Sequence, residues 1–159
     1  MYTQLIKGAN VSHFSQIKTK IDNREHLVGA LEQLGLKPNV FETPQPLRGY
    51  YGEQDEYYAQ IIIPGSSLQL CADIGFIWNE TTGVYDLIHD SYETSRRLGK
   101  DFFTHQLLEK YGDRVIRAKA AELEQRLGTC SITEINTNTK QTLRLTFANH
   151  QVQQQYHRR

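Results

Sequence analysis

The sequence predicts an α+β protein with an antiparallel sheet of about six to seven strands and helices packed on one face of that sheet. Two observations lead to this class. Runs rich in β-branched and aromatic residues follow one another across short polar turns, as in a meander of antiparallel strands. Apolar residues with a helical period occur in separate segments before and after those runs. The expected order is strand, helix, three or four strands, helices and a final pair of strands.

One strand and one helix are expected first. Side chains alternate over residues 11–21, which predicts a half-buried strand with Ile17 on its inner face. Asp22 is followed three residues later by Glu25, the spacing of a capping box, in which both side chains bond free backbone N–H groups at the start of a helix. A helix is therefore expected over residues 23–34.

The middle of the chain is expected to form the meander. Proline cannot donate a hydrogen bond to a sheet, so Pro44 and Pro46 indicate an edge strand or an extended loop at residues 40–47. Pro64-Gly65 has the composition of a type II turn. The strands expected around that turn cover residues 57–63, 68–78 and 84–90.

Two helices and a hairpin are expected in the last third of the chain. Aligned apolar residues predict helices over residues 101–111 and 113–127, with a kink or break at Gly112 between them. Residues 131–135 and 143–147 are expected to form a hairpin around the polar loop at 136–141, and the second strand alternates apolar and polar side chains.

Length and hydropathy predict a single soluble domain over residues 11–148 of the 159-residue chain. Residues 1–10 are interpreted as an N-terminal extension, and the Gln-rich residues 149–159 as a disordered tail. No apolar run approaches the roughly 20 residues of a membrane-spanning helix, so no membrane span is expected. The first residues resemble neither a secretory signal nor a transit peptide, which predicts synthesis in the compartment of use.

Charge and motif content disfavour several classes of function. The 18 Lys and Arg residues balance 18 Asp and Glu residues, whereas nucleic-acid binders usually carry a basic excess. Cys71 and Cys130 belong to no metal-binding spacing and are interpreted as reduced thiols. The histidines also lack metal-binding spacing, and there is no phosphate-binding loop or dinucleotide fingerprint. We therefore expect no metal site and no cofactor.

Alternation fixes the register expected for the hairpin over residues 68–78 and 84–90, because a slip of one residue would turn every side chain to the opposite face. Asp73 and Asp90 then face each other at one end. Paired carboxylates can perform acid–base chemistry or hold a cation, which makes these two the catalytic candidates. The alternative is two hydrated aspartates, or one that caps a turn, and we expect exposure. The other expected pairs are Trp78 with Tyr85, Ile77 with Asp86, Phe76 with Leu87, Gly75 with Ile88 and Ile74 with His89.

Arg48, Tyr50 and Tyr51 are the binding candidates. The run Arg48-Gly49-Tyr50-Tyr51 begins like the aromatic strand of an RNA-recognition motif, whose rings stack on bases while Arg contacts phosphate. Acidic residues follow where apolar ones should stand, and carboxylates repel phosphate. The alternatives are a glycine bend with half-buried tyrosines, or an aromatic patch that contacts a protein.

One compact basic cluster consists of Arg96, Arg97 and Lys100. It precedes the helix expected from residue 101. Three such charges could hold a phosphate or an acidic partner, but we interpret the cluster as the solvated entry of that helix.

Several motifs in a fixed order resemble a known family. These motifs are SHFSQIKTKI at 12–21, RGYYG at 48–52, DIGFIWN at 73–79 and YDLIHD at 85–90. On them, most of residues 11–147 resembles the family of hypothetical chloroplast open reading frame thirty-five, conserved proteins of unknown function in algal plastids and cyanobacteria. The resemblance implies a photosynthetic cell, with cyanobacterial cytoplasm or plastid stroma as the compartment, and brings no catalytic residues. Such proteins usually begin at the equivalent of Val11, which suggests that residues 1–10 reflect start-site misannotation or a short tail.

Three readings of function stay open. The first is a non-catalytic protein-binding or accessory factor in a photosynthetic cell, based on clustered tyrosines and on the lack of catalytic spacing. The second is an enzyme whose site is assembled only in the fold. The third is an RNA-binding module. We expect the first, with a protein as the partner.

Overall fold

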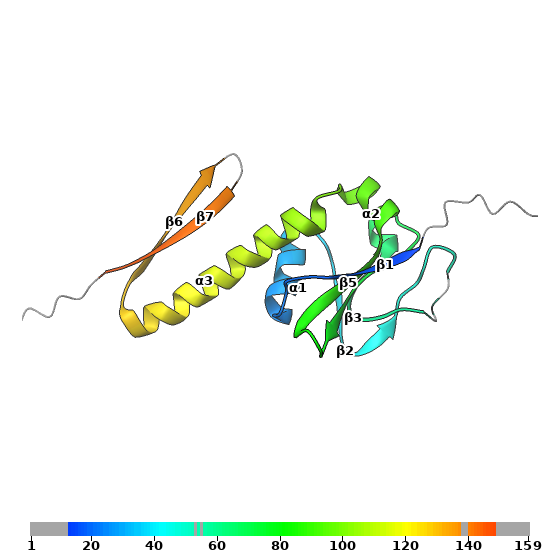
Figure 1. Ribbon diagram of the computed structural model, residues 1–159, viewed down its shortest axis with the longest axis horizontal. Coiled ribbons are helices and arrows are strands. Elements are labelled where there is room, and N and C mark those ends of the chain that lie inside the picture. The colour runs from blue at the N-terminus through cyan, green and yellow to red at the C-terminus, as the bar shows by residue number, and fades with distance from the viewer. Residues whose placement is uncertain (1–12, 53, 55, 138–139, 149–159) are drawn as a thin grey trace, which may run out of the picture. The chain divides into compact units, whose positions relative to one another are not determined.

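The protein is described by a computed structural model that covers residues 13–52, 54, 56–137 and 140–148 (Figure 1). The chain divides into two compact units, the first ending at Lys110 and the second beginning at Tyr111. The described part of the first unit contains a five-stranded antiparallel sheet, and that of the second a two-stranded one. The α+β class is confirmed, and the described strands are divided between two sheets. The predictions made for residues 1–10 and for the tail at 149–159 lie outside the described residues.

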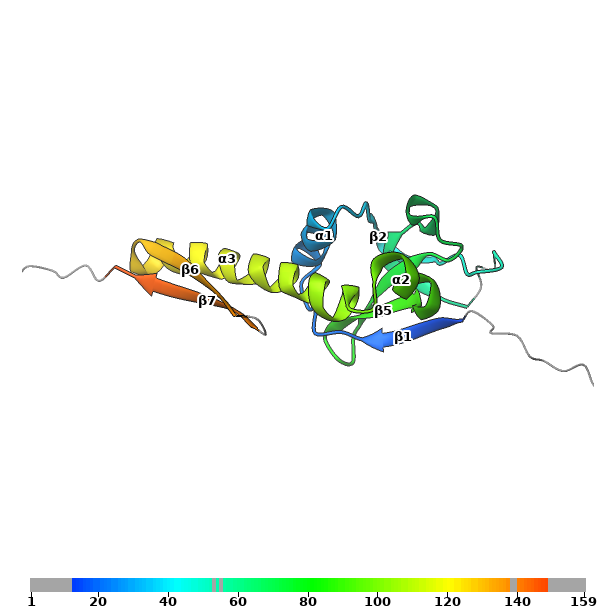
Figure 2. The same ribbon diagram turned by 90° about the horizontal axis from the view of Figure 1, so that it is seen from above.

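The first sheet is a meander closed on one side by the first strand. Strands β2 to β5 pair in chain order, and β1 pairs with β5, so the connection through α1 (Arg24–Gln33) crosses from one edge of the sheet to the other. Figure 2 shows β1 beside β5. In spatial order the strands are β1 (Phe14–Lys18), β5 (Val84–Asp90), β4 (Ile74–Asn79), β3 (Tyr58–Ile63) and β2 (Asn39–Pro46).

The register expected for the β4–β5 hairpin is confirmed. Pairing places Phe76 opposite Leu87 on one face of the sheet and Gly75 opposite Ile88 on the other. The pairs of Trp78 with Tyr85 and of Ile77 with Asp86 are also present. The edge position expected for the proline-containing strand is likewise confirmed, since β2 is the last strand of the sheet.

Apolar side chains are buried on both faces of the sheet. On the first face, Phe76 and His89 contact the ring of Phe103, which comes from a π-helical turn η2 (Phe102–Gln106). Ile61, Ile63 and Ile74 lie on the same face as Phe76, and all four are fully buried. The second face holds a cluster of Leu47, Ala59, Ile62 and Ile88, with Phe14, Phe41, Tyr57 and Ile77 packed against it.

The N-terminal expectations need two corrections. The helix cap is Asn23 rather than Asp22, because the Asn23 side chain accepts a hydrogen bond from the His26 backbone N–H at 2.9 Å, and α1 starts only at Arg24. The described part of the expected strand is also more exposed than predicted. Ile17 keeps 47% of its surface exposed because β1 lies at the edge of the sheet.

The prediction of a type II turn at Pro64-Gly65 is wrong. A short 3₁₀ helix η1 (Gly65–Leu68) follows Pro64, and the strand expected over residues 68–78 begins only at Ile74. A methyl group on Gly65 would collide with the Ala72 carbonyl group. Glycine is therefore required there for close approach of two backbone segments rather than for a turn with positive φ.

The helical region also differs from the prediction. Residues directly after β5 form a helix, α2 (Ser91–Leu98), which the sequence pattern did not predict. The long helix α3 (Leu107–Leu127) passes through Gly112 without a break, so the break expected there is wrong. The final hairpin is confirmed as β6 (Cys130–Thr137) and β7 (Lys140–Phe147).

Candidate functional site

Helix α2 forms one side of the candidate site, and Asp90 starts it. The Asp90 carboxylate accepts hydrogen bonds from the Tyr92 and Glu93 backbone N–H groups, both at 3.0 Å. The Thr94 hydroxyl donates to the Asp90 carbonyl at 2.8 Å. The two carboxylate bonds satisfy N–H donors that a helix start leaves free, so a segment with few apolar residues is helical here.

Glu93 and Arg97 tie α2 to η1 and to the segment that follows it. The two Glu93 carboxylate oxygens accept hydrogen bonds from the Cys71 and Ala72 backbone N–H groups, each at 2.9 Å. One turn later, Arg97 donates through Nε to the Leu68 carbonyl at 2.8 Å. Both side chains lie on the same side of the helix because they are four residues apart.

Asp73 holds the loop that leads to the tyrosines. Its carboxylate oxygens accept from the backbone N–H groups of Arg48 and Gly65, both at 2.9 Å, and its own N–H donates to the Arg48 carbonyl at 2.8 Å. Arg48 is thereby fixed next to the start of β4. The loop then continues to Tyr50, which contacts the ring of Tyr51 edge-on with centroids 5.0 Å apart.

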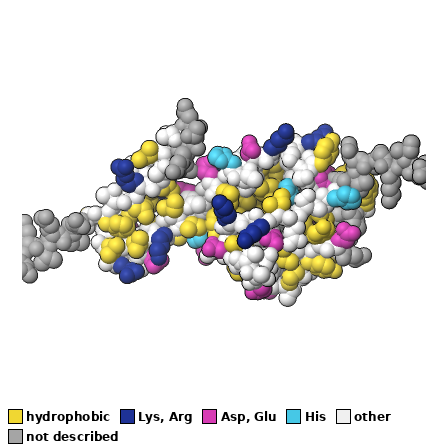
Figure 3. Space-filling model, in the orientation of Figure 1, with side chains coloured by type: hydrophobic (Ala, Val, Ile, Leu, Met, Phe, Trp, Pro, Cys, Tyr) yellow, Lys and Arg dark blue, Asp and Glu magenta, His cyan; other side chains and the backbone are white. Residues whose placement is uncertain are grey.

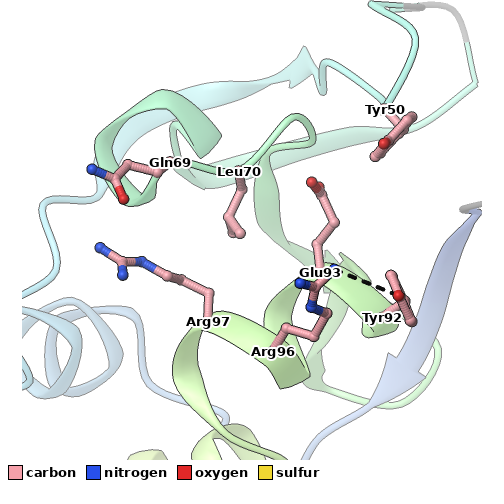
Figure 4. Close-up of a pocket in the computed structure, with 7 residues that line it drawn as sticks. All are labelled: Tyr50, Gln69, Leu70, Tyr92, Glu93, Arg96 and Arg97. Carbon is pink, nitrogen blue, oxygen red and sulfur yellow. Dashed lines mark hydrogen bonds between the residues drawn. The ribbon is translucent and has the colours of Figure 1, made fainter.

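The segments joined by these contacts line a pocket of about 310 Å³ that is open to solvent. Figure 4 shows Tyr50 and Tyr92 at one end, Gln69 and Arg97 at the other, and Leu70 between the two ends. The Arg96 guanidinium lies 5.5 Å from the centre of the Tyr92 ring. The lining consists of Tyr50, Gln69, Leu70, Tyr92, Glu93, Arg96 and Arg97.

The catalytic candidates do not form the expected pair of free carboxylates. Asp73 bonds the loop and Asp90 caps α2, so each carboxylate accepts from two backbone N–H groups. The expected exposure is wrong for Asp90, which is only 3% exposed, and Asp73 is half-buried. The reason is that α2 begins directly at the end of β5 and covers that end of the hairpin.

Of the three binding candidates, one lines the pocket. Tyr50 lines it, whereas Tyr51 is 72% exposed and reaches the site through its contact with Tyr50. Arg48 is half-buried and does not line the pocket. The location expected for the basic cluster is wrong, because Arg96 and Arg97 lie in the last turn of α2 rather than at a helix entry.

Sequence reasoning missed four lining residues, namely Gln69, Leu70, Tyr92 and Glu93. A usable signal was present, since Asp90 followed by Glu93 has the spacing of a capping box. That signal would have placed Tyr92, Glu93 and the arginines on one short helix.

Two other reactive side chains lie next to the pocket elements. His89 is buried, with Nδ1 2.7 Å from the Thr94 hydroxyl, and burial lowers its pKa although Asp90 opposes the shift. Desolvation and the neighbouring Glu93 carboxylate raise the pKa of the Cys71 thiol. A raised pKa leaves less reactive thiolate near neutral pH, so Cys71 is not an activated nucleophile.

Three further features bear on function, namely the distribution of surface charge, the grouping of metal-binding side chains and the length of the helices. On the face seen in Figure 3, Lys and Arg side chains are scattered among acidic and hydrophobic ones rather than joined in one stripe. Among the described residues, no group of three or more His, Cys, Asp or Glu side chains could hold a metal ion. No helix within the described ranges is long and apolar enough to cross a membrane.

Comparison with known proteins gives a family without an activity. Residues 30–146 match the family model described as protein of unknown function, DUF1257. The chain is also similar to a protein from Guillardia theta described as uncharacterized protein ycf35. The two are 31% identical over 101 residues, which cover 64% of this chain and 72% of that protein. No solved structure matches the fold.

Proposed function

This chain belongs to the DUF1257 family of proteins of unknown function, and we propose that it is a non-catalytic protein-binding factor that uses the pocket beside α2. The observation that carries the proposal is the group of exposed aromatic rings there. Tyr50 and Tyr92 line the pocket, and Tyr51 packs against Tyr50. Tyrosine offers a large contact area at a low entropic cost and is enriched where proteins bind one another.

The polar groups around the pocket support binding rather than catalysis. A general acid or base must lie within hydrogen-bond reach of the proton that it transfers. The carboxylates of Asp73, Asp90 and Glu93 are each already bonded to two backbone N–H groups. His89 is buried beneath Phe103 and Thr94, and the Cys71 thiol has a raised pKa.

The same proposal places the protein in the cytoplasm of a cyanobacterium or in the plastid stroma. The ycf35 relative from Guillardia theta supports this setting, because it bears the name of the plastid family that the sequence motifs resemble.

The test removes the aromatic contact without disturbing the core. The tagged full chain is used to recover partners from a photosynthetic lysate, as wild type and as the Tyr50→Ala/Tyr51→Ala variant. Loss of two exposed rings at a binding site is expected to weaken association by about tenfold or more. Thermal unfolding should stay nearly unchanged, because both tyrosines are exposed.

Tyr58→Ala is the matched control. Its ring is 44% exposed, close to the 40% of Tyr50, but Tyr58 does not line the pocket. Equal loss of the partner in the control would refute the site. An equal fall in thermal stability and binding would show that the two rings are structural. Co-purification of RNA in place of a protein would favour the RNA-binding alternative.

A further inference from the structure

Two arginines line the pocket without an acidic partner from the protein itself. Arg96 and Arg97 take part in none of the ion pairs that the described residues form. Glu93 is the acidic residue of the lining, and its two oxygens already accept hydrogen bonds from backbone N–H groups. The lining therefore carries a single net positive charge. Its guanidinium donors are open to a ligand.

The arginine side chains are held in place before any ligand binds. Arg97 donates only its Nε to the Leu68 carbonyl, which leaves both terminal amino groups for a second acceptor. Arg96 lies over the Tyr92 ring, with one amino group 3.5 Å from the Tyr92 hydroxyl. Ordering a long side chain upon binding costs free energy, and these contacts reduce that cost.

Apolar surface lies next to this charge. Figure 4 shows Leu70 between the Arg97 end of the pocket and the end formed by Tyr50 and Tyr92. Leu70 itself is nearly buried, so it contributes a small apolar surface to the wall rather than a protruding contact. A ligand that fills the pocket must place an apolar group against Leu70 and the two rings, and an anionic group near the guanidinium ions.

We propose that the pocket recognises an acidic segment of a partner protein, in which one Asp or Glu side chain stands beside an aliphatic or aromatic residue. A carboxylate matches the planar donors of an arginine and carries one negative charge, equal to the surplus on the lining. A phosphate dianion would exceed that surplus and, with twice the charge, would be repelled more strongly by Glu93 than a carboxylate. This inference rests on the proposed protein-binding function and specifies the chemistry of the partner.

The test starts from peptides, because the partner is unidentified. A random decapeptide library displayed on phage is selected on the immobilised full chain and, in parallel, on the Tyr50→Ala/Tyr51→Ala variant. Peptides that prefer the wild type should contain Asp or Glu next to Leu, Ile, Phe or Tyr. The best of them is then synthesised with a fluorescent label, together with a version in which its acidic residue is replaced by the matching amide.

Affinities from fluorescence polarisation then isolate the charge pair. Arg97→Gln and the amide peptide should each weaken binding by about tenfold, as expected for a charge-assisted hydrogen bond. The two changes together should cost little more than either alone, since both remove the same interaction. Arg97→Lys keeps the charge without the planar donors, so its affinity for the peptide should fall between that of the wild type and that of Arg97→Gln. Arg126→Gln, an exposed arginine outside the pocket, should leave binding within about twofold.

Each contrary outcome has a separate meaning. Enrichment of neutral or basic peptides, or equal binding by the Arg97→Gln variant, would overturn the acidic preference. Competition by inorganic phosphate as strong as by the free peptide would replace the carboxylate with a phosphate. A partner protein that depends on the tyrosines but not on Arg97 would refute this inference and leave the binding function intact. Lack of any peptide that prefers the wild type would overturn both.

Discussion

Replacing Gly75 with alanine is expected to destabilise the five-stranded sheet, because the neighbouring side chains leave no room for a methyl group. An added Cβ would lie 2.6 Å from the Cβ of Ala59 and 2.7 and 2.9 Å from the two Cδ atoms of Leu47. Carbon atoms in contact normally lie about 3.5–4.0 Å apart. Both neighbours are fully or almost fully buried, so the cluster must move by about 1 Å to admit the methyl group.

The expected cost follows from two opposing effects. Overpacking a well-filled core costs about 1–3 kcal/mol. Replacing glycine by alanine also restricts the unfolded chain, which offsets about 0.4–1 kcal/mol because Gly75 does not need a positive φ. The net loss in the free energy of unfolding should therefore be about 1–2 kcal/mol.

The assay is urea denaturation followed by the fluorescence of Trp78, the single tryptophan, which lies in β4 three residues from Gly75. Gly112→Ala is the matched control, and it is expected to raise the free energy of unfolding rather than lower it. Apart from its chain neighbours and the backbone of its own helix, nothing lies within 4 Å of a Cβ added there, and the residue is inside α3. Far-UV circular dichroism should therefore report a gain of about 0.5–1 kcal/mol for that variant.

A second substitution tests the assigned cause. Ala59→Gly removes the less yielding of the two contacts, because a Cβ cannot rotate away as the Leu47 methyl groups can. The Gly75→Ala/Ala59→Gly double variant should therefore lose less free energy of unfolding than the sum of the losses of the two single variants. A loss below about 0.5 kcal/mol for Gly75→Ala, or strictly additive effects in the double variant, would refute the packing argument.

Two further predictions concern the residues that support α2. Burial lowers the pKa of His89, so the folded protein binds its proton less tightly than the unfolded chain. The resulting stability is complete above about pH 6.5 and is lost as the pH falls from there through the folded-state pKa. His89→Asn should flatten this part of a plot of unfolding free energy against pH, and an unchanged slope would assign the effect to another group. Asp90→Ala removes the helix cap and should cost about 1–2 kcal/mol in denaturation, whereas Asp90→Asn keeps a side-chain oxygen for the Tyr92 and Glu93 N–H groups and should cost less. Equal losses in both Asp90 variants would mean that the charge matters more than the cap.

The parts of the fold that the sequence predicts well depend on strict alternation. The β4–β5 register was predictable because only one pairing brings Phe76 and Leu87 to the same face, and a slip would bury polar side chains. The edge position of β2 was predictable because Pro44 and Pro46 lack the N–H groups of a central strand. In both cases a single local rule decides the outcome.

The parts that were missed depend on contacts between distant segments. Helix α2 has few apolar residues that would reveal it, and Glu93 bonds a segment about 20 residues earlier in the chain. Gly65 suggested a turn, yet its role is to let the backbone pass close to Ala72. The pocket was therefore visible in the sequence only through Tyr50 and the arginines, without the walls that bring them together.

The pairing of β1 with β5 governs when the chain can complete its sheet during synthesis. Gln16 donates a hydrogen bond to Asp86, seventy residues later, so β1, the earliest in the chain of these five strands, waits longest for its neighbour. The meander from β2 to β5 can form progressively as the nascent chain lengthens, because each of these strands pairs with the one before it. A chain released before Val84 would leave β1 without its neighbour and the edge of β4 open to other molecules. Truncation from the C-terminal side is therefore expected to convert this protein to an aggregating species abruptly at that point rather than by degrees.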